Sequence, residues 1–152
     1  MQVKVKKLHP DAVIPKYAKL GDAGLDLTAI SKKYDSETNR YVYDTGLAFE
    51  IPDGHVGLIF PRSSICKKGL SLSNSVGIID SKYRGSIKFF FAETYFKPLV
   101  ESSYNVGDRI GQIIIMPYPQ IELVESEVLS ETERGDGGFG SSGRWEFILK
   151  II

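Results

Sequence analysis

The chain has 152 residues, enough for one domain that buries roughly 70% of its unfolded surface. Nineteen basic residues balance nineteen acidic residues, so we expect neither nucleic acid nor a membrane as a partner, because both attract proteins with excess positive charge. The single cysteine excludes an internal disulfide, and the lack of a signal-peptide block or an apolar run of about 20 residues predicts the reducing cytoplasm.

Apolar residues recur with a period of two along most of the chain, which is typical of strands with one buried face. The alternating sets are Val3 and Val5; Tyr41 and Tyr43; Leu47, Phe49 and Ile51; Val56, Leu58 and Phe60; and Ile87, Phe89 and Phe91. The continuous run 113–115 predicts a strand buried on both faces. The polar stretch 31–40 predicts a solvated hairpin or loop. Frequent glycines and prolines between these runs favour an all-β barrel or sandwich.

One short helix is expected over residues 63–68. Ser63 and Ser64 supply an N-cap, lysines occupy the last turn, and Gly69 stands at the position after the helix. We expect one domain over 1–152, in which 133–152 form a C-terminal arm and tail. The arm contains the glycine-rich stretch 135–143.

Two segments in the first half of the chain carry groups that suit a phosphorylated ligand. Asp26 lies between two leucines, so a strand would place it on the opposite face from them. It is either a ligand-binding carboxylate or an ordinary outward-facing one. Arg62, Ser63 and Ser64 offer a guanidinium and hydroxyls to an anion at the start of the short helix. Simple helix capping is the alternative.

Two further segments combine glycines with isolated polar residues. In 74–85, Gly77 and Gly85 permit close approach of a ligand to the backbone, Asp80 follows two isoleucines, and Tyr83 offers a flat ring. A hairpin with ordinary turn residues is the alternative. Gln112 is the odd polar residue of an apolar strand that follows a Gly-Asp turn, and it either contacts a ligand or bonds to the backbone.

The fifth segment, 134–143, is rich in glycine, and its consecutive N–H groups can form an anion-binding nest. It lacks the Gly-Lys-Ser/Thr ending of a P-loop. Arg134, Ser141 and Ser142 add donors, and Phe139 can stack on a base; a flexible linker is the alternative. Together the five segments indicate a nucleotide-phosphate binder or hydrolase that holds a divalent cation mostly through the phosphates.

All five segments, in this order, resemble the motifs of the homotrimeric dUTPase family. They read Ala-Gly-Leu-Asp-Leu, Pro-Arg-Ser-Ser, Gly-Ile-Ile-Asp-Ser-Lys-Tyr-Arg-Gly, Gly-Asp-Arg-Ile-Gly-Gln and Arg-Gly-Asp-Gly-Gly-Phe-Gly-Ser-Ser-Gly. The resemblance implies a jelly-roll-like β barrel or sandwich, a homotrimer whose active sites are shared between chains, Mg²⁺ as cofactor, and hydrolysis of dUTP to dUMP and pyrophosphate. A dCTP deaminase, a bifunctional relative, and a non-catalytic nucleotide-binding regulator are the alternatives.

The resemblance also assigns roles to residues. Asp80 matches the carboxylate that activates the attacking water, and Tyr83 the ring that packs on the deoxyribose. Asp26 matches the carboxylate that holds hydrated magnesium. The remaining matches are to substrate-binding positions: Asn74 and Gly77 for uracil; Arg62, Ser63, Ser64 and Gln112 for the phosphates; and Arg134, Phe139, Gly140, Ser141 and Ser142 in the arm that closes over the substrate.

Three features depart from the family pattern. Gly111 stands where alanine is common, which we expect to be a small packing change. The loops 31–40 and 91–104 look longer than in compact members. A tail, 144–152, follows the arm, and its alternating Trp145, Phe147, Leu149 and Ile151 predict that it docks on a subunit as a strand.

Overall fold

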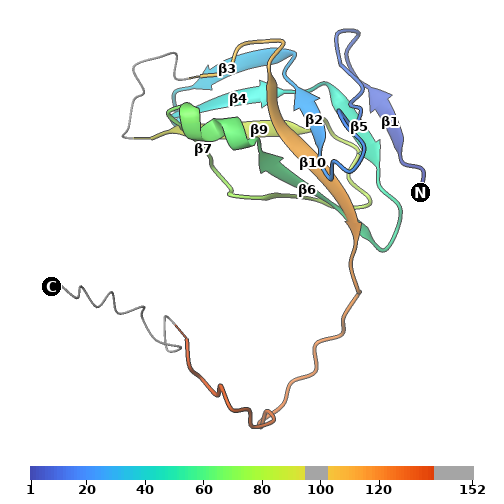
Figure 1. Ribbon diagram of the computed structural model, residues 1–152, viewed down its shortest axis with the longest axis vertical. Coiled ribbons are helices and arrows are strands. Elements are labelled where there is room, and N and C mark those ends of the chain that lie inside the picture. The colour runs from blue at the N-terminus through green and yellow to red at the C-terminus, as the bar shows by residue number, and fades with distance from the viewer. Residues whose placement is uncertain (95–102, 139–152) are drawn as a thin grey trace, which may run out of the picture. The chain divides into compact units, whose positions relative to one another are not determined.

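The computed structural model describes residues 1–94 and 103–138 (Figure 1). The chain divides into two parts, Met1–Gln120 and Ile121–Ile152. The strands and the helix belong to the first part. They are β1 (Lys4–Lys7), β2 (Leu25–Thr28), β3 (Ser31–Asp35), β4 (Arg40–Asp44), β5 (Leu47–Glu50), β6 (His55–Pro61), the 3₁₀ helix η1 (Ser63–Lys67), β7 (Leu70–Leu72), β8 (Gly77–Ile79), β9 (Lys88–Glu93) and β10 (Arg109–Pro117). No helix of the described residues is long and apolar enough to cross a membrane.

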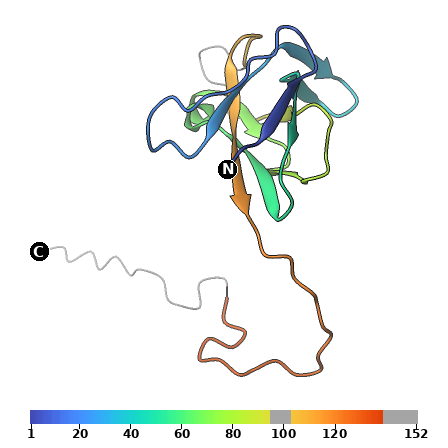
Figure 2. The same cartoon turned by 90° about the vertical axis from the view of Figure 1, so that its right-hand side faces the viewer.

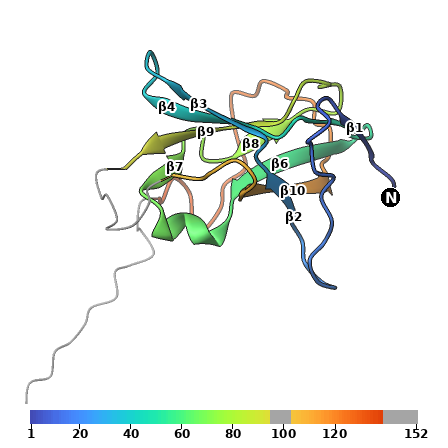
Figure 3. The same cartoon turned by 90° about the horizontal axis from the view of Figure 1, so that it is seen from above.

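Two four-stranded antiparallel sheets make up the body of the fold, which confirms the all-β prediction. One sheet has the order β2-β10-β6-β8 and the other β3-β4-β9-β7, and β1 pairs with β5 beside them. Seen from above, β3 and β4 lie in one layer and β6 and β10 in the other (Figure 3). The long strand β10 runs antiparallel to β6 from Gly111 opposite Pro61 to Pro117 opposite His55 (Figure 2).

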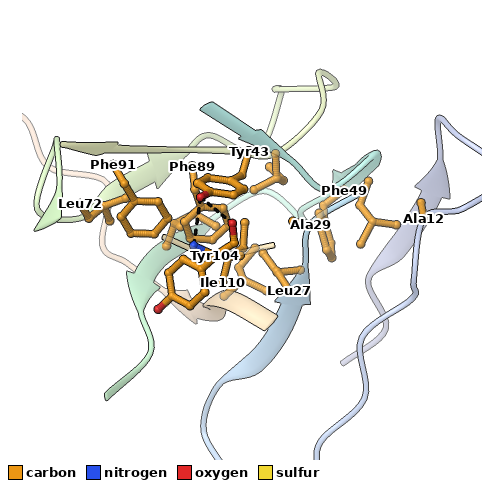
Figure 4. Packing of buried hydrophobic residues seen from close by; sticks show 14 of the residues in the cluster. Ala12, Leu27, Ala29, Tyr43, Phe49, Leu72, Phe89, Phe91, Tyr104 and Ile110 are labelled. Carbon is orange, nitrogen blue, oxygen red and sulfur yellow. Dashed lines mark hydrogen bonds between the residues drawn. The ribbon is translucent and has the colours of Figure 1, made fainter. Parts of the chain in front are cut away.

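The hydrophobic core lies between these sheets (Figure 4). Ile87, Phe89 and Phe91 share the inner face of their segment, as predicted, and all three are buried. The Phe89 and Phe91 rings stack with centroids 6.0 Å apart, and Tyr43 packs edge-on against Phe91. The opposite sheet contributes the buried side chains Leu27, Ile59, Ile110 and Ile113. The aromatic layer therefore fixes the spacing of the two sheets.

The prediction that Val56, Leu58 and Phe60 form the buried face of β6 is wrong. Gly57 and Ile59 are buried, whereas Val56, Leu58 and Phe60 are only half-buried and point outward. Gly57 explains which residues face inward, because the core has no room for a side chain at this position: a Cβ there would lie 2.7 Å from the Ile51 side chain. The strand thus turns its smallest residue toward a crowded core.

The run 113–115 is also less enclosed than predicted, since only Ile113 is fully buried. Cross-strand register places Leu58 beside both Ile114 and Ile78, and Val56 beside Met116. We call these side chains, together with Phe60, the outer apolar face. Its members are Val56, Leu58, Phe60, Ile78, Ile114 and Met116. This face is apolar enough that the sheet has hydrophobic surface on both sides.

Two local predictions have different outcomes. The stretch 31–40 forms the hairpin of β3 and β4, as expected, with Asn39 in a left-handed conformation at φ 56°. The helix at 63–68 is a five-residue 3₁₀ helix whose N-cap is Arg62, without a side-chain capping bond, and whose chain leaves in an extended conformation at Lys68. It ends there because the Gly69 carbonyl accepts a hydrogen bond from Thr94 N, which draws the chain directly into β7.

Candidate active site

The first cluster of candidate residues joins three elements around one carboxylate. Asp26 on β2 accepts a bond from Arg62 Nε at 2.9 Å through Oδ1 and from Arg109 Nη1 at 3.0 Å through Oδ2. The side chains of Asp26 and Arg62 are 23% and 29% exposed, and that of Arg109 is 53% exposed. Two guanidiniums against one carboxylate leave this cluster with an excess of positive charge, which suits a polyphosphate.

Gln112 lies directly opposite Asp26 in the ladder between β10 and β2. Its Nε2 donates to the Pro61 carbonyl at 3.1 Å, so the backbone bond considered from the sequence is present. A Cβ at Gly24 would lie 2.1 Å from Gln112 Oε1, which explains the glycine of the first segment. Asp26, Gln112 and Gly24 line one pocket of about 230 Å³.

The serines of η1 lie next to this cluster along the chain. Ser63 is exposed, Ser64 is half-buried, and the Ser63 carbonyl accepts a bond from Cys66 Sγ at 3.1 Å. Within residues 1–94 and 103–138 the Arg62 guanidinium bonds to Asp26 through Nε alone, which leaves its Nη donors for another partner. The serines do not cap the start of this helix, because its N-cap residue is Arg62 and no side-chain capping bond is made.

The segment 74–85 does not form the hairpin that was the alternative from the sequence, because β8 and the next strand, β9, belong to different sheets. Residues 73–76, which precede β8, also connect different sheets, since β7 lies beside β9. The chain crosses from one layer to the other here. Ser73 N bonds to the Phe90 carbonyl at 2.8 Å on one side, and Ser75 turns the chain at φ 60°. On the other side, Gly77 pairs with Ile59 of β6 in the second sheet, and a Cβ on Gly77 would lie 3.0 Å from the Ile59 side chain. Asn74 is exposed in this crossing loop.

Asp80 begins a tight turn that is closed by Tyr83 N bonding to the Asp80 carbonyl at 3.1 Å. Tyr83 donates to the Ser86 carbonyl at 3.2 Å, and its ring covers Gly85, where a Cβ would lie 2.3 Å from the phenol oxygen. The Asp80 carboxylate is exposed and has no hydrogen bond or ion pair within 1–94 and 103–138. Asp80, Tyr83 and Gly85 line a hollow of about 550 Å³.

The candidate residues therefore fall into separate groups within one chain. Asp26, Arg62 and Gln112 are brought together, and Asp80 and Tyr83 line a different hollow with the strand β8. Arg134 Nε bonds to the Gly137 carbonyl at 2.9 Å, within a turn at Gly135. The predicted arm residues Phe139, Gly140, Ser141 and Ser142, the tail 144–152, and loop residues 95–102 lie outside the described residues.

Sequence reasoning missed two contributors and misjudged a third. Arg109 follows the Gly-Asp turn directly, but no local pattern links it to Asp26, 83 residues earlier. Gly24 stood in the first segment without an assigned role. Gly111 is not a small packing change, because a Cβ there would lie 2.0 Å from Phe89 Cε1.

The fold is similar to that of solved phage dUTPases. The dUTPase of Staphylococcus bacteriophage 80alpha, with dUpNHpp, matches 94% of this chain and 99% of its own, with 28% identity and a TM-score of 0.76. A family model described as dUTPase matches residues 11–143, and the chain belongs to the dUTPase family.

Curated relatives agree with this placement. The deoxyuridine 5′-triphosphate nucleotidohydrolase of Hydrogenobaculum sp. is 41% identical over 145 residues, which span 94% of this chain and 99% of that protein. The enzyme of the same name from Nautilia profundicola is 41% identical over 145 residues, spanning 95% of this chain and all of that protein.

Proposed function

We propose that this chain hydrolyses dUTP to dUMP and pyrophosphate, and thereby limits uracil incorporation into DNA and supplies dUMP for dTMP synthesis. The observation that carries the proposal is the Asp80 carboxylate, unpaired within the described residues, beside Tyr83 at a hollow of about 550 Å³. An exposed carboxylate without a partner is free to accept a proton from water and to fix its line of attack on the α-phosphorus. Pyrophosphate then departs as the leaving group.

Charge neutralisation of the phosphates is the role we propose for the cluster around Asp26. Arg62 retains its Nη donors, and Arg109 supplies the second positive charge. Ser63, Ser64 and Gln112 add neutral donors on the same segments. Positioning and neutralisation account for most of the catalysis in phosphoryl transfer, so no histidine or cysteine nucleophile is required.

The donor set fits a magnesium ion carried by the substrate. Within the described residues no group of three or more His, Cys, Asp or Glu side chains could enclose a metal. Each Asp26 oxygen accepts one guanidinium and retains capacity for a second donor, so Asp26 would contact the ion through water. Bound Mg²⁺ would neutralise charge on the phosphate oxygens.

Substrate selection is proposed to lie in the crossing loop and the Asp80 turn. Asn74 and the backbone at Gly77 would bond to uracil, and the Tyr83 ring would leave no room for a 2′-hydroxyl. Packing of Gly77 against Ile59 supports a slot with fixed width, which would exclude the methyl group of thymine.

A homotrimer with shared sites is the assembly we propose. The Asp26 cluster and the Asp80 hollow are separate in one chain, and a site built from neighbouring subunits would unite them. The outer apolar face offers one surface for association. The segment after β10 offers another, because its apolar side chains are exposed: Ile121, Leu123, Val124, Val128 and Leu129. In this proposal 1–152 act as one domain, whose arm from residue 133 closes over the substrate through Arg134, Phe139, Gly140, Ser141 and Ser142.

The test is a panel of dUTP, dTTP, dCTP and UTP with Mg²⁺, scored for pyrophosphate and for ammonia. Hydrolysis of dUTP well above the others supports the proposal, whereas ammonia release from dCTP would establish the deaminase instead. Asp80→Asn should abolish turnover and retain affinity for dUpNHpp, because it removes the base and no phosphate donor. Full turnover in Asp80→Asn would refute the role of this carboxylate.

A further inference from the structure

Tyr104 is a rigid aromatic residue at the boundary between the core and η1. It is 3% exposed and makes edge contacts with Tyr43 and tilted contacts with Phe91, at centroid distances of 6.1 and 5.6 Å. Its backbone is held as well: Tyr43 Oη donates to the Tyr104 carbonyl at 3.0 Å and accepts a bond from the Tyr104 N–H at 3.1 Å. The Lys68 ammonium lies 5.2 Å from the ring centroid. The ring therefore has little freedom to turn.

The phenol oxygen of this ring is a buried polar atom without a satisfactory partner. It points out of the aromatic cluster, away from Tyr43 and Phe89 (Figure 4). Among the described residues no group meets it in good hydrogen-bond geometry. An unsatisfied buried hydroxyl is destabilising, so its retention calls for a physical reason. Phenylalanine would fill the same space without this cost.

Two groups that act on the phenol belong to the proposed phosphate site. Burial raises the pKa of Tyr104, and the Ser64 hydroxyl and the Arg62 guanidinium act in the opposite direction. The phenol thus remains protonated at neutral pH and keeps a hydrogen to donate. The Ser64 hydroxyl therefore lies near the phenol, although no hydrogen bond of good geometry joins the two.

The turn that follows Tyr104 fixes its position relative to the same site. Asn105 N bonds to Asp108 Oδ2 at 2.8 Å, and Gly107 N bonds to the Ala29 carbonyl at 2.8 Å. Tyr104 enters this turn and Arg109 leaves it. Tyr104, before the turn, therefore lies near Ser64. Arg109, after the turn, bonds to Asp26, which also binds Arg62.

We infer that Tyr104 is a positioning residue for phosphate binding, whose phenol donates to Ser64 Oγ when the site is filled. A serine hydroxyl has one hydrogen. If its oxygen accepts from Tyr104, that hydrogen is directed toward the phosphate, and the buried phenol is satisfied in the same step. The inference rests on the proposed function, because it assigns Ser64 to the phosphates of dUTP.

The test compares Tyr104→Phe with Tyr41→Phe, which removes a tyrosine hydroxyl from the outer part of the same aromatic group. For Tyr104→Phe we expect KM for dUTP and the Kd of dUpNHpp to rise about 3- to 10-fold, the effect of one hydrogen bond, with kcat within twofold. Its melting temperature should not fall, because an unsatisfied group is removed. Tyr41→Phe should leave KM and Kd at the wild-type values.

A double-mutant cycle with Ser64→Ala identifies the route of the effect. In the Ser64→Ala background, Tyr104→Phe should change KM and Kd no further. Wild-type constants in Tyr104→Phe, or a full additional effect without Ser64, would overturn the inference while dUTP hydrolysis stands. A wild-type protein that binds dUpNHpp without hydrolysing dUTP would defeat the proposed reaction alone, and the Kd comparison would still test Tyr104. A protein that does neither overturns both.

Discussion

Replacement of Gly111 by alanine gives a direct measure of how tightly the two sheets are packed. The added Cβ would lie 2.0 Å from Phe89 Cε1, 2.4 Å from Phe89 Cζ and 2.9 Å from the Phe60 carbonyl oxygen. Relief requires the Phe89 ring to retreat by more than an ångström, since carbon atoms in contact lie about 3.5–4.0 Å apart. Phe89 is fully buried and stacks on Phe91, so the movement is passed into the core.

Overpacking of this kind costs about 1–3 kcal/mol. In a chain of this length each kcal/mol lowers the melting temperature by about 2–4 °C, so Gly111→Ala should melt about 2–12 °C below wild type. Calorimetry and urea titration are the assays. Gly138→Ala is the matched control, because a Cβ there meets nothing within 4 Å.

The contact with Phe89 can be tested by compensation. Phe89→Leu removes the ring atoms that meet the new methyl group, so the Gly111→Ala/Phe89→Leu protein should lose less stability than the two single changes added together. A Gly111→Ala protein that melts with wild type, or strict additivity in the double variant, would refute the steric reasoning.

Two other predictions concern charge and pH. Burial raises the pKa of Tyr43 from 10.0 to about 12, so this tyrosine ionises first in the unfolded chain. The free energy of unfolding should therefore hold up to about pH 10 and fall by about 3 kcal/mol between pH 10 and 12. Urea titrations over this range should show a smaller decline for Tyr43→Phe, and an equal decline in the variant and the wild type would contradict the prediction. Asp26→Asn should weaken dUTP binding several-fold and cost about 1 kcal/mol of stability, because Arg62 and Arg109 lose a shared carboxylate that is only partly buried; equal Kd for dUpNHpp in the variant would argue against a positioning role.

Much of the fold follows from local pattern, and the exceptions have physical causes. The period of two identified strands and placed Phe89 and Phe91 correctly inside. It failed for β6, because hydrophobicity favoured Val56, Leu58 and Phe60, whereas the core face takes Ile59 and has room at position 57 only for glycine. The sequence pattern shows which residues are apolar. When both faces of a strand are apolar, packing decides which face points into the core.

Motifs singled out some of the candidate residues that lie together, but not those whose contacts depend on tertiary structure. Asp26, Arg62 and Gln112 belonged to separate segments, and the structure brings these three together. The contributions of Arg109 and Tyr104 depend on the turn 105–108, whose geometry relative to β2 and η1 is set by pairings remote in sequence. No short-range signal distinguishes such residues from ordinary strand neighbours.

The passage of the chain from β7 to β8 has a mechanical consequence for the loop at Asn74. A loop that joins two paired strands can move when that one hairpin bends. This loop is anchored in both sheets, so the distance between its two ends can change only if the sheets shift relative to each other. Such sliding would disturb the interlocked rings between them. If this loop recognises uracil as proposed, its selectivity would depend on the packing of both sheets and not on the loop alone.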